Sequence, residues 1–192
     1  MRDSKLSRAR TDAQAAPGSA LPADFVVWYD EHRPTVFRYV RFRLATREAA
    51  EDVTSEVFLK ALRSFGRYDP AKASPRTWLL RIARNAVTDH LRALRRRGSL
   101  HVSLDKVPDL VSGDDSPEVR LVREERVQRI LNASKRLRRS DQEILSLRYG
   151  TGLSNQEIAE TMDVSQNAVA VRIHRALKRL KDTLDLDAVE RS

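Results

Sequence analysis

Apolar residues recur at three- and four-residue spacing along most of the chain, a pattern typical of amphipathic helices. In the first half it predicts helices over about 25–44, 47–64 and 75–97. Ser74 is a good N-cap for the third of these, and Pro75 suits its first position. These signals predict a helical block in the first half of the chain.

The second half repeats the helical spacing and adds clear start signals. Ser140 with Glu143, and Ser154 with Glu157, have the spacing of a capping box, so a helix is expected to begin at each serine. A short turn around Asp163 joins two helices, which predicts a helix-turn-helix. The helix expected over about 119–137 should bury an inner face made of Leu121, Val122, Val127, Ile130, Leu131 and Leu137.

The helical blocks are separated by a segment without helical spacing. Residues 98–118 hold two glycines and two prolines, which indicates a linker. The pattern therefore predicts an all-α protein of two small helical domains, 24–97 and 119–184, joined by a flexible acidic linker. Residues 1–23 are expected to form a disordered N-terminal tail, and residues 185–192 a C-terminal tail.

Charge points to a polyanionic partner. The chain carries 36 Lys and Arg against 27 Asp and Glu, a net charge of +9. Residues 70–97 carry +7 and residues 119–184 carry +6, whereas 98–118 carry −4. Two separate basic blocks favour two contacts with nucleic acid, with plain solvated helices as the alternative.

Other classes of function find no support in the sequence. There is no cysteine for a disulfide or thiolate ligand, and the four histidines lack metal-ligand spacing. No nucleophile–base or phosphate-loop motif is present, so we expect no catalytic site, metal or cofactor. Apolar runs are too short to span a bilayer and no secretory signal opens the chain, which predicts a cytoplasmic protein.

Two motifs carry a family resemblance. The pattern Trp78-Leu-x-x-Ile82-Ala83-x-Asn85-x-x-x-Asp89-x-x-Arg92, after an acidic Glu51-Asp52-Val-Thr-x-Glu56-x-Phe58 helix, resembles region two of bacterial sigma factors, above all the extracytoplasmic-function (ECF) group. Residues 152–169, followed by Arg172-Ile-His-Arg-Ala176-Leu, are similar to sigma region four. Together the motifs imply a promoter-specificity subunit of RNA polymerase.

The resemblance also implies partners. The acidic helix would dock on the β′ clamp of core RNA polymerase, region four would meet the β flap and promoter DNA, and an anti-sigma factor would control the protein. An acidic helix beside a basic one suits this pairing of a protein partner with a nucleic acid. The residues expected to face polymerase are Glu51, Asp52, Thr54, Ser55 and Glu56.

The basic helix and the loop before it are expected to hold the melted minus-ten element. Aromatic rings and guanidinium groups stack on unpaired bases, and cations follow the backbone. The candidates are Phe65, Arg67, Tyr68, Arg76, Arg81, Arg84, Asn85, Thr88 and Arg92. The alternative for Phe65 and Tyr68 is packing beneath the loop, and Trp78 is expected in the core.

The last helix is expected to read the minus-thirty-five duplex. With Val169 turned inward, Asn167 and Val171 point outward, where they suit an adenine edge and a thymine methyl. The candidates are Ser165, Gln166, Asn167, Ala170, Val171, Arg172, His174, Arg175, Lys178 and Arg179. A helix-turn-helix alone also fits a dimeric regulator that binds duplex DNA without core polymerase, and this reading stays open as the alternative.

Overall fold

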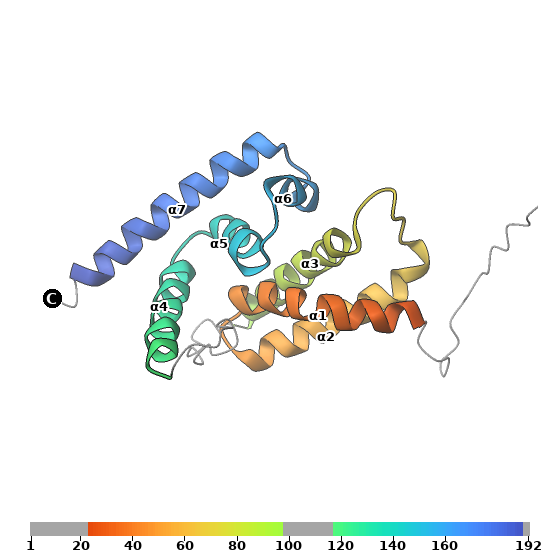
Figure 1. The fold of residues 1–192 in the computed structure, drawn as a ribbon, viewed down its shortest axis with the longest axis horizontal. Helices are drawn as coiled ribbons and strands as arrows, with labels where there is room; N and C mark the ends of the chain where they lie inside the picture. Colours follow the sequence, from red (N-terminus) through yellow and green to blue (C-terminus); the bar gives the residue numbers. More distant parts are fainter. Residues whose placement is uncertain (1–22, 98–116, 190–192) are drawn as a thin grey trace, which may run out of the picture.

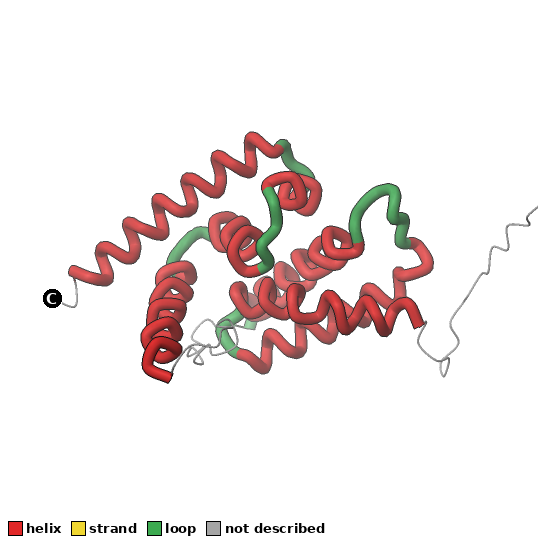
Figure 2. Tube along the Cα trace, viewed as in Figure 1, coloured by secondary structure: helices red, strands yellow, loops and turns green. Residues whose placement is uncertain are grey.

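The protein is helical throughout the part of the chain that the computed structural model describes, residues 23–97 and 117–189, and no strand occurs within these ranges (Figures 1 and 2). The predicted all-α fold is confirmed. Nearly all of the expected N-terminal tail and of the expected linker lies outside the described residues, although Ala23, expected in the tail, begins a helix. The last helix continues through Val189, beyond the predicted end near residue 184.

The first helical unit contains α1 (Ala23–Arg43), α2 (Arg47–Ser64), the short η1 (Phe65–Arg67) and α3 (Pro75–Arg96). Side chains start two of these helices. The Thr46 hydroxyl accepts a hydrogen bond from the Ala49 backbone N–H, and the Ser74 hydroxyl accepts one from Thr77. The three long helices pack on one another around a core that includes Val36, Val40, Val53, Val57, Leu79, Leu80 and Ala83 (Figure 1).

The second helical unit contains α4 (Pro117–Lys135), α5 (Arg139–Leu145), the π-helical turn η3 (Ser146–Gly150), α6 (Asn155–Met162) and α7 (Gln166–Val189). The helix-turn-helix predicted for α6 and α7 is present. Ser154 and Glu157 form the predicted capping box, and Asp163 closes α6 in left-handed backbone geometry with φ 56° and ψ 54°. The Ser165 hydroxyl caps α7 by accepting the Ala168 N–H.

The capping box predicted at Ser140 is wrong. Helix α5 begins at Arg139, its N-cap is Arg138, and no side chain caps it. Asp141, inside the predicted box, is buried and accepts hydrogen bonds from Arg179 of α7 at 3.0 and 2.8 Å.

Half of the inner face predicted for α4 is wrong. Leu131 is buried and Val127 and Leu137 are half-buried, but Leu121, Val122 and Ile130 are 58%, 48% and 41% exposed. Among the described residues, helix α4 packs mainly on α7, so the side toward α7 is the one that they cover (Figure 1). On α7 itself Val169 is buried as predicted and Ala176 is buried with it, whereas the neighbouring Leu177 is 38% exposed.

The two units lie directly against each other. Helix α3 packs on α6, and α1 packs on η3 (Figure 1). At the second contact Gly150 faces Arg38 and Phe42 of α1. The arrangement brings the basic helix of the first unit beside the helix-turn-helix of the second.

No helix in the described ranges joins the length and the apolar character that crossing a lipid bilayer requires.

Candidate nucleic-acid interface

One side of α2 presents an acidic, solvent-exposed face. Asp52, Ser55 and Glu56 are exposed and Glu51 is half-buried. Two carboxylates lie in helical ion pairs, Glu51 with Arg47 at 2.8 Å and Glu56 with Lys60 at 2.6 Å. These pairs are largely open to water, so the carboxylates can exchange partners at small cost.

Thr54 does not lie on this face. Its side chain is only 2% exposed, and its hydroxyl donates to the Ala50 carbonyl at 2.7 Å. The expectation that Thr54 faces polymerase is corrected, because its side chain points into the core between α2 and its neighbours. Sequence reasoning missed Leu59, which is 54% exposed one turn beyond Ser55 and Glu56. An apolar residue on the polar side of a helix was the available signal.

Phe65 and Tyr68 belong to an aromatic cluster at the end of the first unit. The Trp28 ring lies 5.1 Å from Phe65, 4.8 Å from Tyr68 and 6.2 Å from Trp78, measured between centroids. The Tyr68 hydroxyl donates to the Ala73 carbonyl at 2.9 Å. Both loop aromatics thus pack beneath the loop, as the alternative predicted, while remaining half-buried. Trp28 joins them from α1, a contact that no local pattern in the sequence indicated.

Three of the predicted minus-ten arginines contact the second unit. Arg84 donates to the Glu143 carboxylate at 2.7 Å and to the Thr161 carbonyl at 2.8 Å. Arg81 donates twice to the Glu160 carbonyl, at 3.2 and 2.6 Å.

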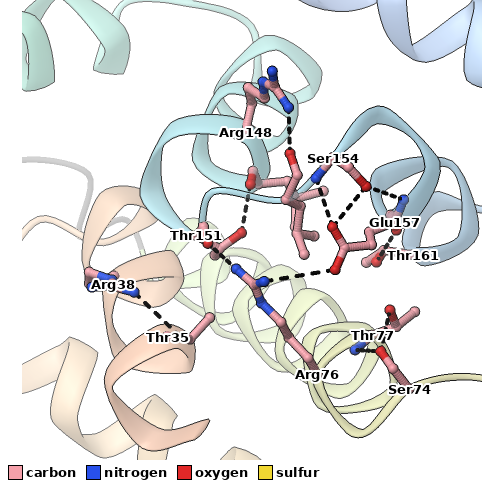
Figure 3. Close-up of polar contacts among 12 residues, drawn as sticks. Thr35, Arg38, Ser74, Arg76, Thr77, Arg148, Thr151, Ser154, Glu157 and Thr161 are labelled. Atoms are coloured by element: carbon pink, nitrogen blue, oxygen red, sulfur yellow. Dashed lines mark hydrogen bonds and ion pairs between the residues drawn. The ribbon is translucent and has the colours of Figure 1, made fainter.

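Arg76 makes the third contact. It donates to the Thr151 carbonyl and lies 3.7 Å from the Glu157 carboxylate (Figure 3). Burial opposes the charge on Glu157, but hydrogen bonds from Ser154 and the charge of Arg76 outweigh it and hold the pKa of Glu157 below its ordinary value. Sequence reasoning missed Glu143 and Glu157 as partners, because nothing local links them to α3.

The remaining minus-ten candidates are divided between solvent and local contacts. Arg67, Asn85 and Arg92 are exposed. A side-chain nitrogen of Arg92 lies 3.4 Å from the Asp89 carboxylate, so these two residues form a local ion pair. The Thr88 hydroxyl donates to the Arg84 carbonyl at 2.8 Å, so the hydroxyl proton is already used in a hydrogen bond within the helix.

Positive charge accumulates where α1, α3 and α5 end or begin. Burial, and then the charges of Arg95, Arg43 and Arg92, lower the pKa of Arg139. Arginine stays protonated in proteins, so the lowered pKa reflects first the burial of the Arg139 guanidinium and then repulsion from the neighbouring cations, without loss of charge. Such a concentration of positive potential attracts phosphate groups.

The exposed side of α7 carries most of the predicted minus-thirty-five set. Gln166, Asn167, Ala170 and Val171 are exposed in its first two turns. The exposed residues farther along are Arg172, His174, Arg175 and Lys178. The arrangement suits a helix whose first turns enter a major groove while later cations reach phosphates.

Two members of the set have structural partners. Ser165 caps the helix through its hydroxyl. Arg179 pairs with buried Asp141 and so ties α7 to α5. Its contact with phosphate stays a prediction.

Comparison with protein families divides the chain as the geometry does. Residues 28–97 match the family model described as Sigma-70 region 2, and residues 127–180 match Sigma-70, region 4. The first range includes α2, α3 and the aromatic cluster, and the second includes the helix-turn-helix. The two matches follow each other in the order that the sequence motifs predicted.

Individual relatives support the same family. The ECF RNA polymerase sigma factor BldN of Streptomyces coelicolor is 36% identical over 160 residues, a match that covers 83% of this chain and 60% of BldN. This chain therefore spans less than two thirds of the length of BldN. SigD of Mycobacterium tuberculosis, also an ECF sigma factor, is 35% identical over 156 residues, covering 79% of this chain and 73% of SigD.

Solved structures share the fold. CnrH in complex with the cytosolic domain of CnrY superimposes with a TM-score of 0.63 at 23% identity, over 85% of this chain and 88% of CnrH. RpoE of Bartonella quintana in complex with the anti-sigma factor NepR gives 0.67 at 18% identity, over 85% and 98%. With two family models in order and relatives above 30% identity, the chain belongs to the ECF family of RNA polymerase sigma factors, which are transcription initiation factors.

Proposed function

We propose that this chain binds core RNA polymerase and directs it to a specific set of promoters, acting as an initiation factor without chemistry of its own. The observation that carries the proposal is the ordered pair of sigma regions, residues 28–97 and 127–180, in one chain. A lone helix-turn-helix would fit many regulators, but an acidic helix placed ahead of it has no role in simple duplex binding.

The polymerase contact is proposed for the exposed face of α2. Asp52, Ser55, Glu56 and Leu59 project on this face, with Glu51 at its edge. Exposed carboxylates around one apolar side chain suit a basic partner surface, because the carboxylates set orientation and the leucine loses water on binding. The β′ clamp is the partner that family membership indicates.

Duplex reading is proposed for the start of α7. Gln166 and Asn167 offer donors and acceptors to base edges, while Ala170 and Val171 offer only apolar contact. Arg172, Arg175 and Lys178 would hold phosphates. We expect a minus-thirty-five preference that rests on few polar base contacts.

Strand capture at the minus-ten element is proposed for α3 and the loop before it. Arg67, Asn85 and Arg92 are open to solvent in this structure, whereas Arg76, Arg81 and Arg84 contact the second unit. The half-buried aromatic cluster adds stacking surface beside them. The structural neighbours include sigma factors bound by CnrY or the anti-sigma factor NepR, and we propose that a protein of that kind restrains this chain.

The test is run-off transcription with core polymerase on a library of genomic promoter fragments. Wild-type chain should produce discrete transcripts, and the double variant Asp52→Lys with Glu56→Lys should lose both core binding and transcription by about tenfold or more. The matched control is Asp182→Lys, an exposed acidic residue on α7 away from the proposed surface. Tight binding of palindromic duplex by the chain alone, with no transcription, would favour the dimeric regulator instead.

A further inference from the structure

Four arginines come together where the two helical units join, and they are called here the junction arginines: Arg43, Arg92, Arg95 and Arg139. Arg43 ends α1, Arg92 and Arg95 lie in the last turns of α3, and Arg139 begins α5. Besides its own burial, the charges of the other three junction arginines lower the pKa of Arg139, so all three lie close to it. Three elements far apart in sequence therefore gather four like charges in one place.

Arg43 is the buried member of this group, and its partner is neutral. The residue is 7% exposed, and its Nη1 donates to the Tyr39 hydroxyl at 3.2 Å. Its Nε is buried and finds no hydrogen-bond partner in the described part of the chain. Burial raises the pKa of Tyr39 to about 12, so this phenol is neutral near pH 7 and supplies no counter-charge. A buried cation is costly unless an anion pairs with it.

The carboxylates near the junction already have partners. They pair as follows: Glu143 with Arg84, Asp141 with Arg179, and Asp89 with Arg92. Within residues 23–97 and 117–189, the other three junction arginines have no carboxylate at ion-pair distance. Four positive charges against the single negative charge of Asp89 leave a net charge of +3.

A small anion with linked phosphates fits this group best. The N–H groups of a guanidinium match the oxygens of a phosphate, often two at a time. Arg92 and Arg95 are separated by a rise of about 4.5 Å along α3, and Arg43 and Arg139 come from other helices, so one phosphate does not span the group. A chain of two or three phosphates has the length and the several negative charges that are needed. The backbone of a DNA duplex fits less well, because a side chain as buried as Arg43 is out of its reach.

We propose that the junction arginines bind a small anion of linked phosphates, either inorganic or carried by a nucleotide. Arg43, Arg92 and Arg95 hold the anion from the first helical unit and Arg139 holds it from the second, so the ligand bridges α1 and α3 to α5. The bound anion supplies the counter-charge that Arg43 lacks. Apart from Arg92, none of these residues belongs to a proposed polymerase or DNA contact, and the inference does not depend on the proposed function.

Isothermal titration calorimetry of the full chain with sodium tripolyphosphate tests the site, at constant ionic strength so that screening does not change. Wild type should bind one tripolyphosphate per chain. Arg139→Gln, at a half-buried position, should weaken binding about tenfold, because a charge-assisted contact is lost. The matched control is Arg63→Gln, an exposed position at the opposite end of α2 from the junction, which should bind like wild type. Absence of saturable binding, or equal weakening in both variants, overturns the proposal.

Arg43→Met separates a ligand site from a purely structural role. Methionine occupies a similar space without charge, so the variant should weaken tripolyphosphate binding by about tenfold or more and should melt at a higher temperature than wild type without ligand, because an uncompensated buried cation is gone. Tripolyphosphate should raise the melting temperature of wild type and leave that of Arg43→Met unchanged. Undiminished binding by the folded Arg43→Met variant overturns the proposal.

Further titrations distinguish the source of the phosphates. ATP that binds more tightly than tripolyphosphate identifies a nucleotide, and ATP that binds equally or more weakly identifies an inorganic polyphosphate; either result supports the site. Random-sequence duplex DNA whose affinity falls in Arg43→Met as much as that of tripolyphosphate would make the junction a DNA contact and overturn the proposal. Tripolyphosphate binding that requires replacement of the aspartates in residues 98–118 by Asn would show that the chain supplies its own anion, which also overturns it.

Discussion

The pair formed by Asp141 and Arg179 predicts an unequal response to removing either partner. Both nitrogen–oxygen contacts come from one guanidinium nitrogen, at 3.0 and 2.8 Å, and they join α5 to α7. The Asp141 side chain is 8% exposed, whereas that of Arg179 is 43% exposed. Arg179→Ala therefore leaves a carboxylate buried and unpaired, while Asp141→Ala leaves a guanidinium that water can reach.

The magnitudes follow from this asymmetry. Leaving a buried charge without a partner costs about 3 kcal/mol, and the favourable position of Asp141 in the first turn of α5 offsets about 0.5 kcal/mol of this cost. We therefore expect Arg179→Ala to lower the free energy of unfolding by about 2.5 kcal/mol. Asp141→Ala loses the hydrogen bonds and the helix-end interaction, about 1.5 kcal/mol together. The difference of about 1 kcal/mol between the variants is the quantity to measure.

The assay is urea denaturation followed by far-ultraviolet circular dichroism, with wild type, each alanine variant and the double variant. The double variant should cost no more than Arg179→Ala, because no buried carboxylate remains. A loss below about 0.5 kcal/mol for both single variants, or a larger loss for Asp141→Ala, would refute the reasoning. The salt dependence of duplex binding by Arg179→Ala adds a functional check. It should match wild type if Asp141 holds this arginine, whereas Lys178→Ala should reduce the slope by about one.

Three further outcomes can be checked by simpler means. Replacing Asp163 by Gly should raise the free energy of unfolding by up to about 1 kcal/mol, and replacing it by Val should lower it by at least as much, since φ is 56° there; thermal denaturation of both variants decides this. The pKa of Glu157 is held low in the folded chain, so its contribution to stability should be complete above its ordinary pKa of 4.5 and disappear as pH falls through the lower folded value; melting temperatures of wild type and Glu157→Gln should converge as acid is added. Burial raises the pKa of Tyr39 to about 12, so one of the four tyrosines should ionise only near that pH in a spectrophotometric titration, and Tyr39→Phe should remove that step. The neutral phenol stabilises the fold below pH 10 and this contribution is lost as pH rises toward 12.

Features fixed by neighbours in sequence were predictable. The capping of α3 by Ser74, the capping box of Ser154 with Glu157, and the short turn around Asp163 all involve groups within a few residues of one another. The inward position of Val169 follows from the helical period once the apolar face of this helix is taken as the buried one. Helix number, the helix-turn-helix and the family motifs depend on such local patterns, so the sequence sufficed for the fold class and the family.

Features fixed by packing were not predictable. Ser140 and Glu143 have capping-box spacing, yet they form no capping box. Asp141 between them accepts a hydrogen bond from Arg179, and Glu143 accepts one from Arg84. Leu121 and Ile130 have inner-face spacing, yet they are exposed because α4, among the described residues, packs mainly on α7. Helical period says that two faces differ, but the partner decides which face is covered.

The arginines of α3 show most clearly the difference between what local sequence predicts and what packing decides. Sequence by itself determined that a helix over about 75–97 is amphipathic and strongly basic, because charge and period are properties of the chain. Only the tertiary structure decided that Arg76, Arg81 and Arg84 lie on α6 and its flanking loop. A guanidinium binds phosphate, carboxylate and helix carbonyls through the same N–H groups, so its chemistry names a class of partner, and three-dimensional proximity selects the one it holds.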